Sequence, residues 1–86
     1  MIEKNVKIIN ETGLHARPAS QFVEKASRFK SRVFIEKDGR KVDAKSIIGV
    51  LGLGAGKGSI VKIIAEGDDE QEAVDELVKL LHSFEE

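Results

Sequence analysis

The chain has 86 residues, 41% of them apolar, so we expect a single domain over residues 1–86 with one core. Its charged residues, 34% of the chain, nearly cancel to a net charge of −1, which argues against nucleic-acid binding by bulk charge. The absence of cysteine excludes disulfides and thiolate metal sites. No signal peptide or membrane-spanning run is evident, so we expect a cytoplasmic protein without membrane insertion.

The first half of the chain predicts a strand, a helix and a hairpin. Residues 3–9 suit a strand because Val6 and Ile8 alternate with polar neighbours. A turn leads from it to a helix that begins at Ala16 and spans three to four turns. Apolar side chains at helical spacing predict the buried face of this helix: Ala19, Phe22, Val23, Ala26 and Phe29. Residues 33–35 suit a second strand, and a hairpin at residues 38–39 returns the chain through Val42.

The second half of the chain predicts two more helices and one strand. Ser46 is a good N-cap for a short helix that extends to Leu51. A fourth strand is predicted over residues 60–66, and Asp68 or Asp69 then caps the last helix. Apolar spacing predicts the buried face of that helix: Ala73, Val74, Leu77, Val78, Leu81 and Phe84.

The predicted order is β-α-β-β-α-β-α. Short strands with partly alternating polarity suit an antiparallel sheet with one face covered by helices. The expected fold class is therefore α+β.

His15 precedes Arg17 and Pro18 at the expected start of the first helix. The first amides of a helix lack an internal acceptor, and the helix dipole adds positive potential, so an anion is favoured there. The backbone amides of Ala16 and Arg17 would bind such an anion, and the Arg17 guanidinium carries donors suited to phosphate oxygens. Pro18 has the backbone angle of a first helical turn. This arrangement predicts a histidine that is transiently phosphorylated.

Three segments in register resemble HPr, the family of histidine-containing phosphocarrier proteins of the bacterial sugar phosphotransferase system. TGLHARPAS (residues 12–20) resembles the family's active-site motif. AKSIIGV (residues 44–50) resembles its regulatory serine region, and AEGDDE (residues 65–70) resembles the entry to its last helix. The resemblance implies an open-faced β-sandwich: a four-stranded antiparallel sheet with three helices on one face and His15 exposed at one edge.

The resemblance also implies a mechanism. His15 would accept a phosphoryl group from phosphorylated enzyme I and pass it to an enzyme IIA domain, with Arg17 assisting. The family uses the Nδ1 nitrogen of its histidine. The protein would then be a carrier in a phosphotransferase cascade instead of an enzyme, with no cofactor or metal of its own, and by resemblance a monomer.

Partner proteins should dock on an apolar surface near His15. A helix as short as the one after Ser46 cannot bury every face, so we expect at least one of its apolar side chains to be exposed. The expected docking residues are Thr12, Ala16, Ser20, Ile47, Ile48 and Leu51. By resemblance, Ser46 is also a regulatory phosphorylation site. An HPr kinase/phosphorylase would modify it, and the modified form could bind a transcriptional regulator such as catabolite control protein A.

Two alternatives to a general sugar-system carrier stay open. One is a paralogous carrier of a regulatory, nitrogen-related branch, in which His15 would work identically; the match at residues 45–49 favours the sugar branch. The other is a non-transferring corepressor module, like the catabolite-repression paralogue of HPr. In that paralogue the active-site histidine is replaced, whereas His15 is present here.

Two features could suggest other functions. The glycine-rich residues 52–59 resemble a nucleotide-binding loop, but neither the P-loop nor the dinucleotide pattern fits their spacing. We interpret them as a helix end and a flexible turn into the fourth strand. His82 has no partner histidine at metal-binding spacing and is expected to be structural or solvated.

Overall fold

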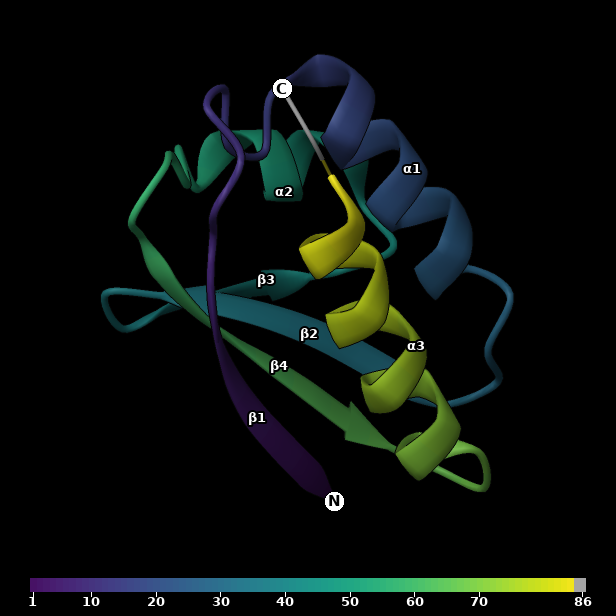
Figure 1. Ribbon diagram of the computed structural model, residues 1–86. Coiled ribbons are helices and arrows are strands. Elements are labelled where there is room, and N and C mark those ends of the chain that lie inside the picture. Colours follow the sequence, from purple (N-terminus) through teal and green to yellow (C-terminus); the bar gives the residue numbers. More distant parts are fainter. Residues whose placement is uncertain (85–86) are drawn as a thin grey trace.

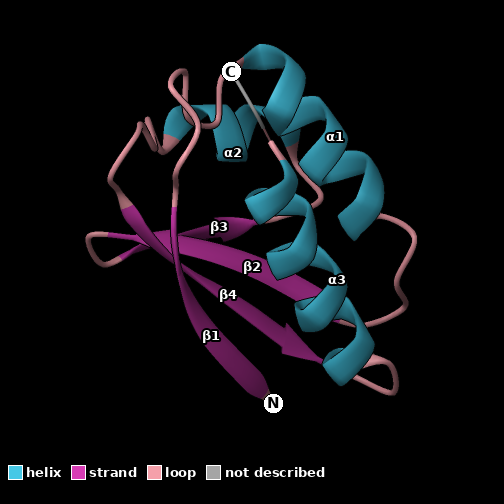
Figure 2. Cartoon of the chain, in the orientation of Figure 1, coloured by secondary structure: helices cyan, strands magenta, loops and turns pink. Residues whose placement is uncertain are grey.

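The computed structural model describes residues 1–84 and confirms the predicted α+β class and element order (Figure 2). The elements are β1 (Ile2–Lys7), α1 (Ala16–Ala26), β2 (Arg32–Lys37), β3 (Arg40–Asp43), α2 (Ile47–Gly52), β4 (Ile60–Glu66) and α3 (Glu70–Ser83).

The strands form one antiparallel sheet in the order β1-β4-β2-β3. All three helices lie on the same side of this sheet, which leaves its other face open (Figure 1). The core fills the space between the sheet and the helices, and Phe22 of α1 is its largest fully buried side chain. The open-faced sandwich that the family resemblance implied is confirmed.

The hairpin between β2 and β3 follows the predicted turn chemistry. Lys37 pairs with Arg40, so Asp38 and Gly39 alone form the loop. Both have positive φ angles, 51° and 81°, which is the conformation of the primed turns that match strand twist. An Asp-Gly pair tolerates this conformation at little cost.

Helical spacing predicted the buried faces of α1 and α3. Ala19, Phe22 and Ala26 of α1 are fully buried, and Val23 packs partly buried against the core. Phe29 was also assigned to this helix, but α1 ends at Ala26, and Phe29 packs against the core from the segment that follows. The buried residues of α3 are Ala73, Val74, Leu77, Val78 and Leu81. Phe84 was assigned to this helix, but it is the C-cap residue beyond Ser83.

The end of the first strand differs from the prediction, which placed it at residue 9. Regular pairing ends at Lys7. Ile8 still donates from its amide to Ser59 and accepts from Gly58, at 2.8 and 2.7 Å. Ile9 is half exposed and outside the strand. The chain therefore leaves the sheet early and forms the loop that carries His15.

Asp69 is the N-cap residue of α3, as expected, but its carboxylate makes no capping bond. It instead accepts hydrogen bonds from the amides of Lys30 and Ser31, both at 2.9 Å, and from the Ser31 hydroxyl. The Ser31 hydroxyl and the Lys30 amide are the main causes that lower the pKa of Asp69 to about 2. The carboxylate thus ties the turn after α1 to the start of α3.

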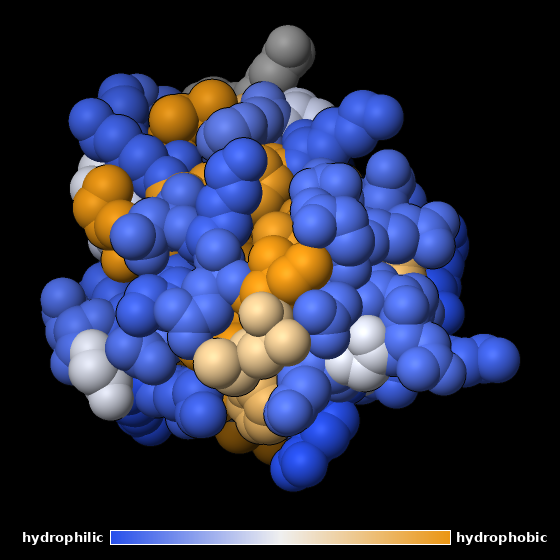
Figure 3. All heavy atoms as spheres, turned by 90° about the horizontal axis from the view of Figure 1, so that it is seen from below, coloured by the Kyte–Doolittle hydropathy of each residue, from blue (hydrophilic) through white to orange (hydrophobic). Residues whose placement is uncertain are grey.

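The surface is largely hydrophilic. Seen from below, apolar atoms form one narrow band and smaller spots among polar ones (Figure 3). Within residues 1–84, the exposed large apolar side chains are Met1, Ile9, Ile48, Leu51 and Ile60. Among the same residues, no helix combines the length and apolarity needed to cross a membrane.

Candidate phosphoryl-acceptor site

His15 is the N-cap residue of α1, and its side chain is exposed. Its backbone is extended, with φ −79° and ψ −175°, and its carbonyl oxygen accepts the Ala19 amide at 2.8 Å. The ring makes no capping bond to the helix. The amides of Ala16 and Arg17 donate to no acceptor within residues 1–84. These amides are therefore available to an anion beside the imidazole.

The loop before His15 is fixed by hydrogen bonds at both ends. The Gly13 amide donates to the Asn10 carbonyl at 3.1 Å, and Asn10 Nδ2 donates to the Gly13 carbonyl at 2.7 Å. The Leu14 amide then donates to the Ala55 carbonyl at 2.8 Å. Asn10 is only 3% exposed. Sequence reasoning missed this residue, for which the only signal was an asparagine in a turn-like stretch.

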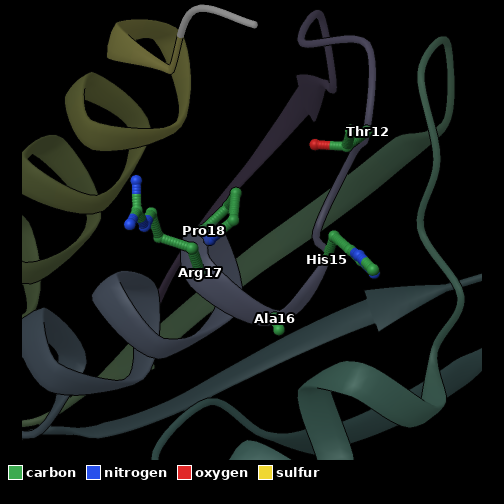
Figure 4. A pocket seen from close by; sticks show the side chains of 5 residues that line it. All are labelled: Thr12, His15, Ala16, Arg17 and Pro18. Carbon is green, nitrogen blue, oxygen red and sulfur yellow. The ribbon is translucent and has the colours of Figure 1, made fainter.

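Thr12, His15, Ala16, Arg17 and Pro18 line one shallow pocket of about 270 Å³ (Figure 4). Of the sequence-predicted site residues, the pocket brings together Thr12, His15, Ala16 and Arg17, whereas Ser46 and the predicted docking residues of α2 do not line it. The His15 ring and the Arg17 guanidinium, however, point to opposite sides of the pocket, while the Thr12 hydroxyl points toward the side of Pro18 and Arg17 (Figure 4). The expected docking residue Ser20 is exposed one turn further along α1 and does not line the pocket.

Among residues 1–84, no acidic side chain pairs with the positive charge at the site. Arg17 is exposed, and within residues 1–84 neither it nor the His15 ring has an ion pair or hydrogen-bonded partner. The first turn of α1 carries no acidic residue that would offset the guanidinium and the helix dipole. A doubly charged phosphoryl group would supply the missing negative charge. Among the described residues, no cluster of His, Cys, Asp or Glu could hold a metal ion.

The apolar side chains of α2 divide between core and surface. Ile48 is 81% and Leu51 42% exposed, whereas Ile47 packs partly buried against the core. The exposure of at least one of them is confirmed. The helix lies at the same end of the molecule as the His15 loop and the start of α1 (Figure 1). Ile48 and Leu51, which we call the α2 patch, are thus exposed on a helix at the same end of the molecule as the candidate phosphoryl-acceptor site.

Ser46 is the N-cap of α2, as predicted. Its Oγ accepts a hydrogen bond from the Gly49 amide at 3.1 Å. Neighbouring residues hold the helix from both ends: Lys45 Nζ donates to the Phe29 carbonyl at 2.8 Å, and Arg40 donates to the Gly52 carbonyl at 3.2 Å. Ser46 is partly buried and precedes Ile48 of the α2 patch by two residues.

The glycine-rich segment after α2 supports the His15 loop. Its interpretation as a connection into β4 holds, but it is no free turn: Ala55 is 3% exposed and accepts from Leu14. Lys57 Nζ lies 2.6 Å from a Glu11 carboxylate oxygen, and this hydrogen bond lowers the pKa of Glu11. His82, as expected, is exposed near the end of α3.

The sequence profile described as "PTS HPr component phosphorylation site" matches residues 2–83. The HPr-like protein Crh of Halalkalibacterium halodurans is 53% identical over 94% of this chain and 96% of that protein. Phosphocarrier protein HPr of Cupriavidus necator is 47% identical, over 94% of this chain and 91% of that protein.

A solved HPr structure from Thermoanaerobacter tengcongensis has a TM-score of 0.94 and 54% identity, and the match covers 96% of this chain and 93% of that one. The fold and the sequence together define a histidine phosphocarrier domain. The chain belongs to the HPr family of the phosphotransferase system. A structure described as an HPr dimer from the same organism has a TM-score of 0.78 and 54% identity, covering 96% of this chain and 95% of that one.

Proposed function

We propose that this protein accepts a phosphoryl group on His15 from phosphorylated enzyme I and passes it to an enzyme IIA domain in sugar uptake. The observation that carries the proposal is the exposed His15 ring at the N-terminus of α1, in one pocket with Arg17. The family match over residues 2–83 supports the same role. The protein is a carrier that holds the group covalently and acts in the cytoplasm.

The transfer exchanges one bond between nitrogen and phosphorus for another. An unprotonated ring nitrogen of His15 attacks the phosphorus atom of the enzyme I phosphohistidine. The new bond forms as the donor bond breaks, and the bonding electron pair returns to the donor ring nitrogen. Because the far nitrogen of each ring keeps its proton, no other reactant is required. Transfer to enzyme IIA repeats this exchange with His15 as donor.

The free amides and Arg17 supply the electrostatic part of this chemistry. The amides of Ala16 and Arg17 would bind phosphoryl oxygens at the helix N-terminus, because neither donates to an acceptor within residues 1–84. The Arg17 guanidinium points away from His15 in the unphosphorylated protein (Figure 4). The negative charge of a phosphoryl group on His15 would draw the Arg17 side chain toward it. Because Arg17 joins the site only when the phosphoryl group is present, the site stabilises that group and still allows its release.

A corepressor function is the second candidate, and the 53% identity to a Crh protein favours it. The presence of His15 supports the carrier, because a corepressor needs no phosphoryl acceptor. A carrier of a nitrogen-related branch would use the same site.

We further propose that Ser46 is a regulatory phosphorylation site for an HPr kinase/phosphorylase. The protein would act as a monomer, although relatives have been solved as dimers.

Incubation with phosphoenolpyruvate and purified enzyme I tests the proposal. The intact mass should rise by one phosphate, through a bond that is labile in acid and stable in base. His15→Ala should abolish this gain, and His82→Ala is the matched control that should keep it. Normal phosphorylation of His15→Ala would refute the assignment.

A further inference from the structure

Asn10 is a buried amide that the proposed mechanism does not use. Its side chain is 3% exposed, although the residue lies in the loop that carries His15. Nδ2 donates to the Gly13 carbonyl at 2.7 Å, but Oδ1 is buried without a hydrogen-bond partner. It is the only such side-chain atom within residues 1–84.

The orientation of this amide is fixed by its surroundings. Rotating it by half a turn would place Oδ1 against the Gly13 carbonyl oxygen, where two acceptors repel. The donor must therefore face Gly13, and the oxygen must face a region where residues 1–84 offer it no donor. Burying an unpaired acceptor carries a desolvation cost that offsets much of the gain from the Nδ2 bond. The Asn10 side chain thus contributes little to the net free energy of unfolding, and its main effect is on the conformation of the loop that carries His15.

The geometry that Asn10 controls is the approach to the histidine. The Asn10 carbonyl accepts the Gly13 amide, and the Asn10 side chain donates to the Gly13 carbonyl, so Asn10 and Gly13 are joined by two hydrogen bonds. The next amide, that of Leu14, is anchored to Ala55. His15 follows directly. Its Cα is therefore held by a backbone that is fixed on both sides of the Gly13–Leu14 peptide.

We propose that Asn10 is a positioning residue for phosphoryl transfer at His15. Through the Gly13 carbonyl it fixes the loop and so aligns the imidazole with the free amides of α1. This inference rests on the proposed function and adds a residue that touches neither the phosphoryl group nor a partner. Misplacing a reacting group by about 1 Å can slow a reaction roughly 100-fold, so a loosened loop should affect the rate.

Asn10→Leu is the sharpest test, because leucine keeps the branched shape and removes both the donor and the unpaired oxygen. With phosphorylated enzyme I as donor, kcat should fall about tenfold or more while KM stays within about twofold, because the α2 patch is unchanged. The midpoint of thermal unfolding should change little. Asn5→Leu, at an exposed asparagine of β1, is the matched control and should leave all three values unchanged.

Amide hydrogen exchange gives a readout that is independent of transfer. In Asn10→Leu, the Gly13 and Leu14 amides should exchange faster, whereas amides of β4 should not. A folded Asn10→Leu protein with wild-type kcat, or with a changed KM alone, would overturn the inference. If that variant does not fold, Asn10→Ala carries the same expectation. Failure of the proposed function itself is separate: wild-type protein would then gain no phosphate.

Discussion

The Ala55 carbonyl oxygen occupies the place that a side chain on Gly13 would need. A Cβ on Gly13 would overlap that oxygen, and the same oxygen accepts the Leu14 amide at 2.8 Å. Gly13 also has a φ of 64°, a conformation that other residues rarely adopt. The loop before His15 therefore reaches the glycine-rich segment only because residue 13 lacks a side chain.

Gly13→Ala should destabilise the protein and slow phosphorylation of His15. Gly54→Ala is a matched control, because Gly54 has nearly the same φ, 65°, but a Cβ at that position would meet no atom within 4 Å. The control should lose only the conformational cost, about 1 kcal/mol. Gly13→Ala should lose about 1–3 kcal/mol more from the overlap. Urea unfolding measures the free energy of unfolding of both variants, and equal losses in the two would show that the contact with Ala55 is unimportant.

Local sequence signals were enough to predict the elements of this fold. The Asp38-Gly39 turn, the Ser46 cap and the buried faces of α1 and α3 each depend on residues close together in the chain. Such signals follow from backbone conformation and side-chain periodicity alone. Family resemblance then supplied the three-helix, open-faced arrangement.

Contacts between distant segments were not predictable in the same way. Asp69 was expected to cap α3, but its carboxylate bonds to Lys30 and Ser31 across the fold. The glycine-rich segment was expected to be flexible, yet Ala55 anchors the His15 loop. The sequence also placed Arg17 beside His15 without showing that the two side chains diverge. The first two depend on tertiary contacts and the third on side-chain rotamers at the surface, and residue spacing encodes neither.

Arg17→Ala should impair transfer far more than folding. The side chain is exposed and has no partner within residues 1–84, so the free energy of unfolding should change by less than about 1 kcal/mol. Loss of charge-assisted contacts to the phosphoryl group, worth about 1.5–3 kcal/mol, should slow transfer by about one to two decades. Arg28→Ala, beyond the opposite end of α1, is the control. Stopped-flow transfer at the wild-type rate would contradict the role given to Arg17.

Ile48→Glu should weaken docking without affecting the acceptor chemistry. Ile48 is 81% exposed, so the free energy of unfolding should change by about 0.5 kcal/mol or less. A charge in the centre of an apolar contact typically costs more than about 1 kcal/mol, so KM for enzyme I should rise about tenfold. Ile60→Glu, at a 54% exposed isoleucine of β4, is the matched control. Steady-state kinetics with equal KM values for both variants would place docking elsewhere.

Asp69 should make stability depend on pH in the acid range. Its pKa is about 2 in the folded protein, below the ordinary value of 3.8, so its contribution is complete above about pH 4 and is lost as the pH falls through 2. Asp69→Asn should therefore be less stable than wild type at pH 7, with the difference shrinking toward pH 2. Urea unfolding at several pH values measures this, with Asp68→Asn as control. A difference that is constant with pH would refute the assignment.

Phosphorylation of Ser46 should slow transfer to His15 while leaving the fold intact. Ser46 Oγ already accepts the Gly49 amide, and a phosphate at this position adds about two negative charges where the helix dipole favours them. The same charges would lie at the N-terminus of the helix that carries the α2 patch, where they oppose burial of Ile48 and Leu51 against a partner. Ser46→Asp carries a smaller charge and should show a weaker form of the effect, a raised KM for enzyme I with an unchanged melting temperature. Ser46→Asn retains a capping oxygen without the charge and is the matched control. Wild-type kinetics in both Ser46→Asp and the genuinely phosphorylated protein would reduce Ser46 to a helix cap.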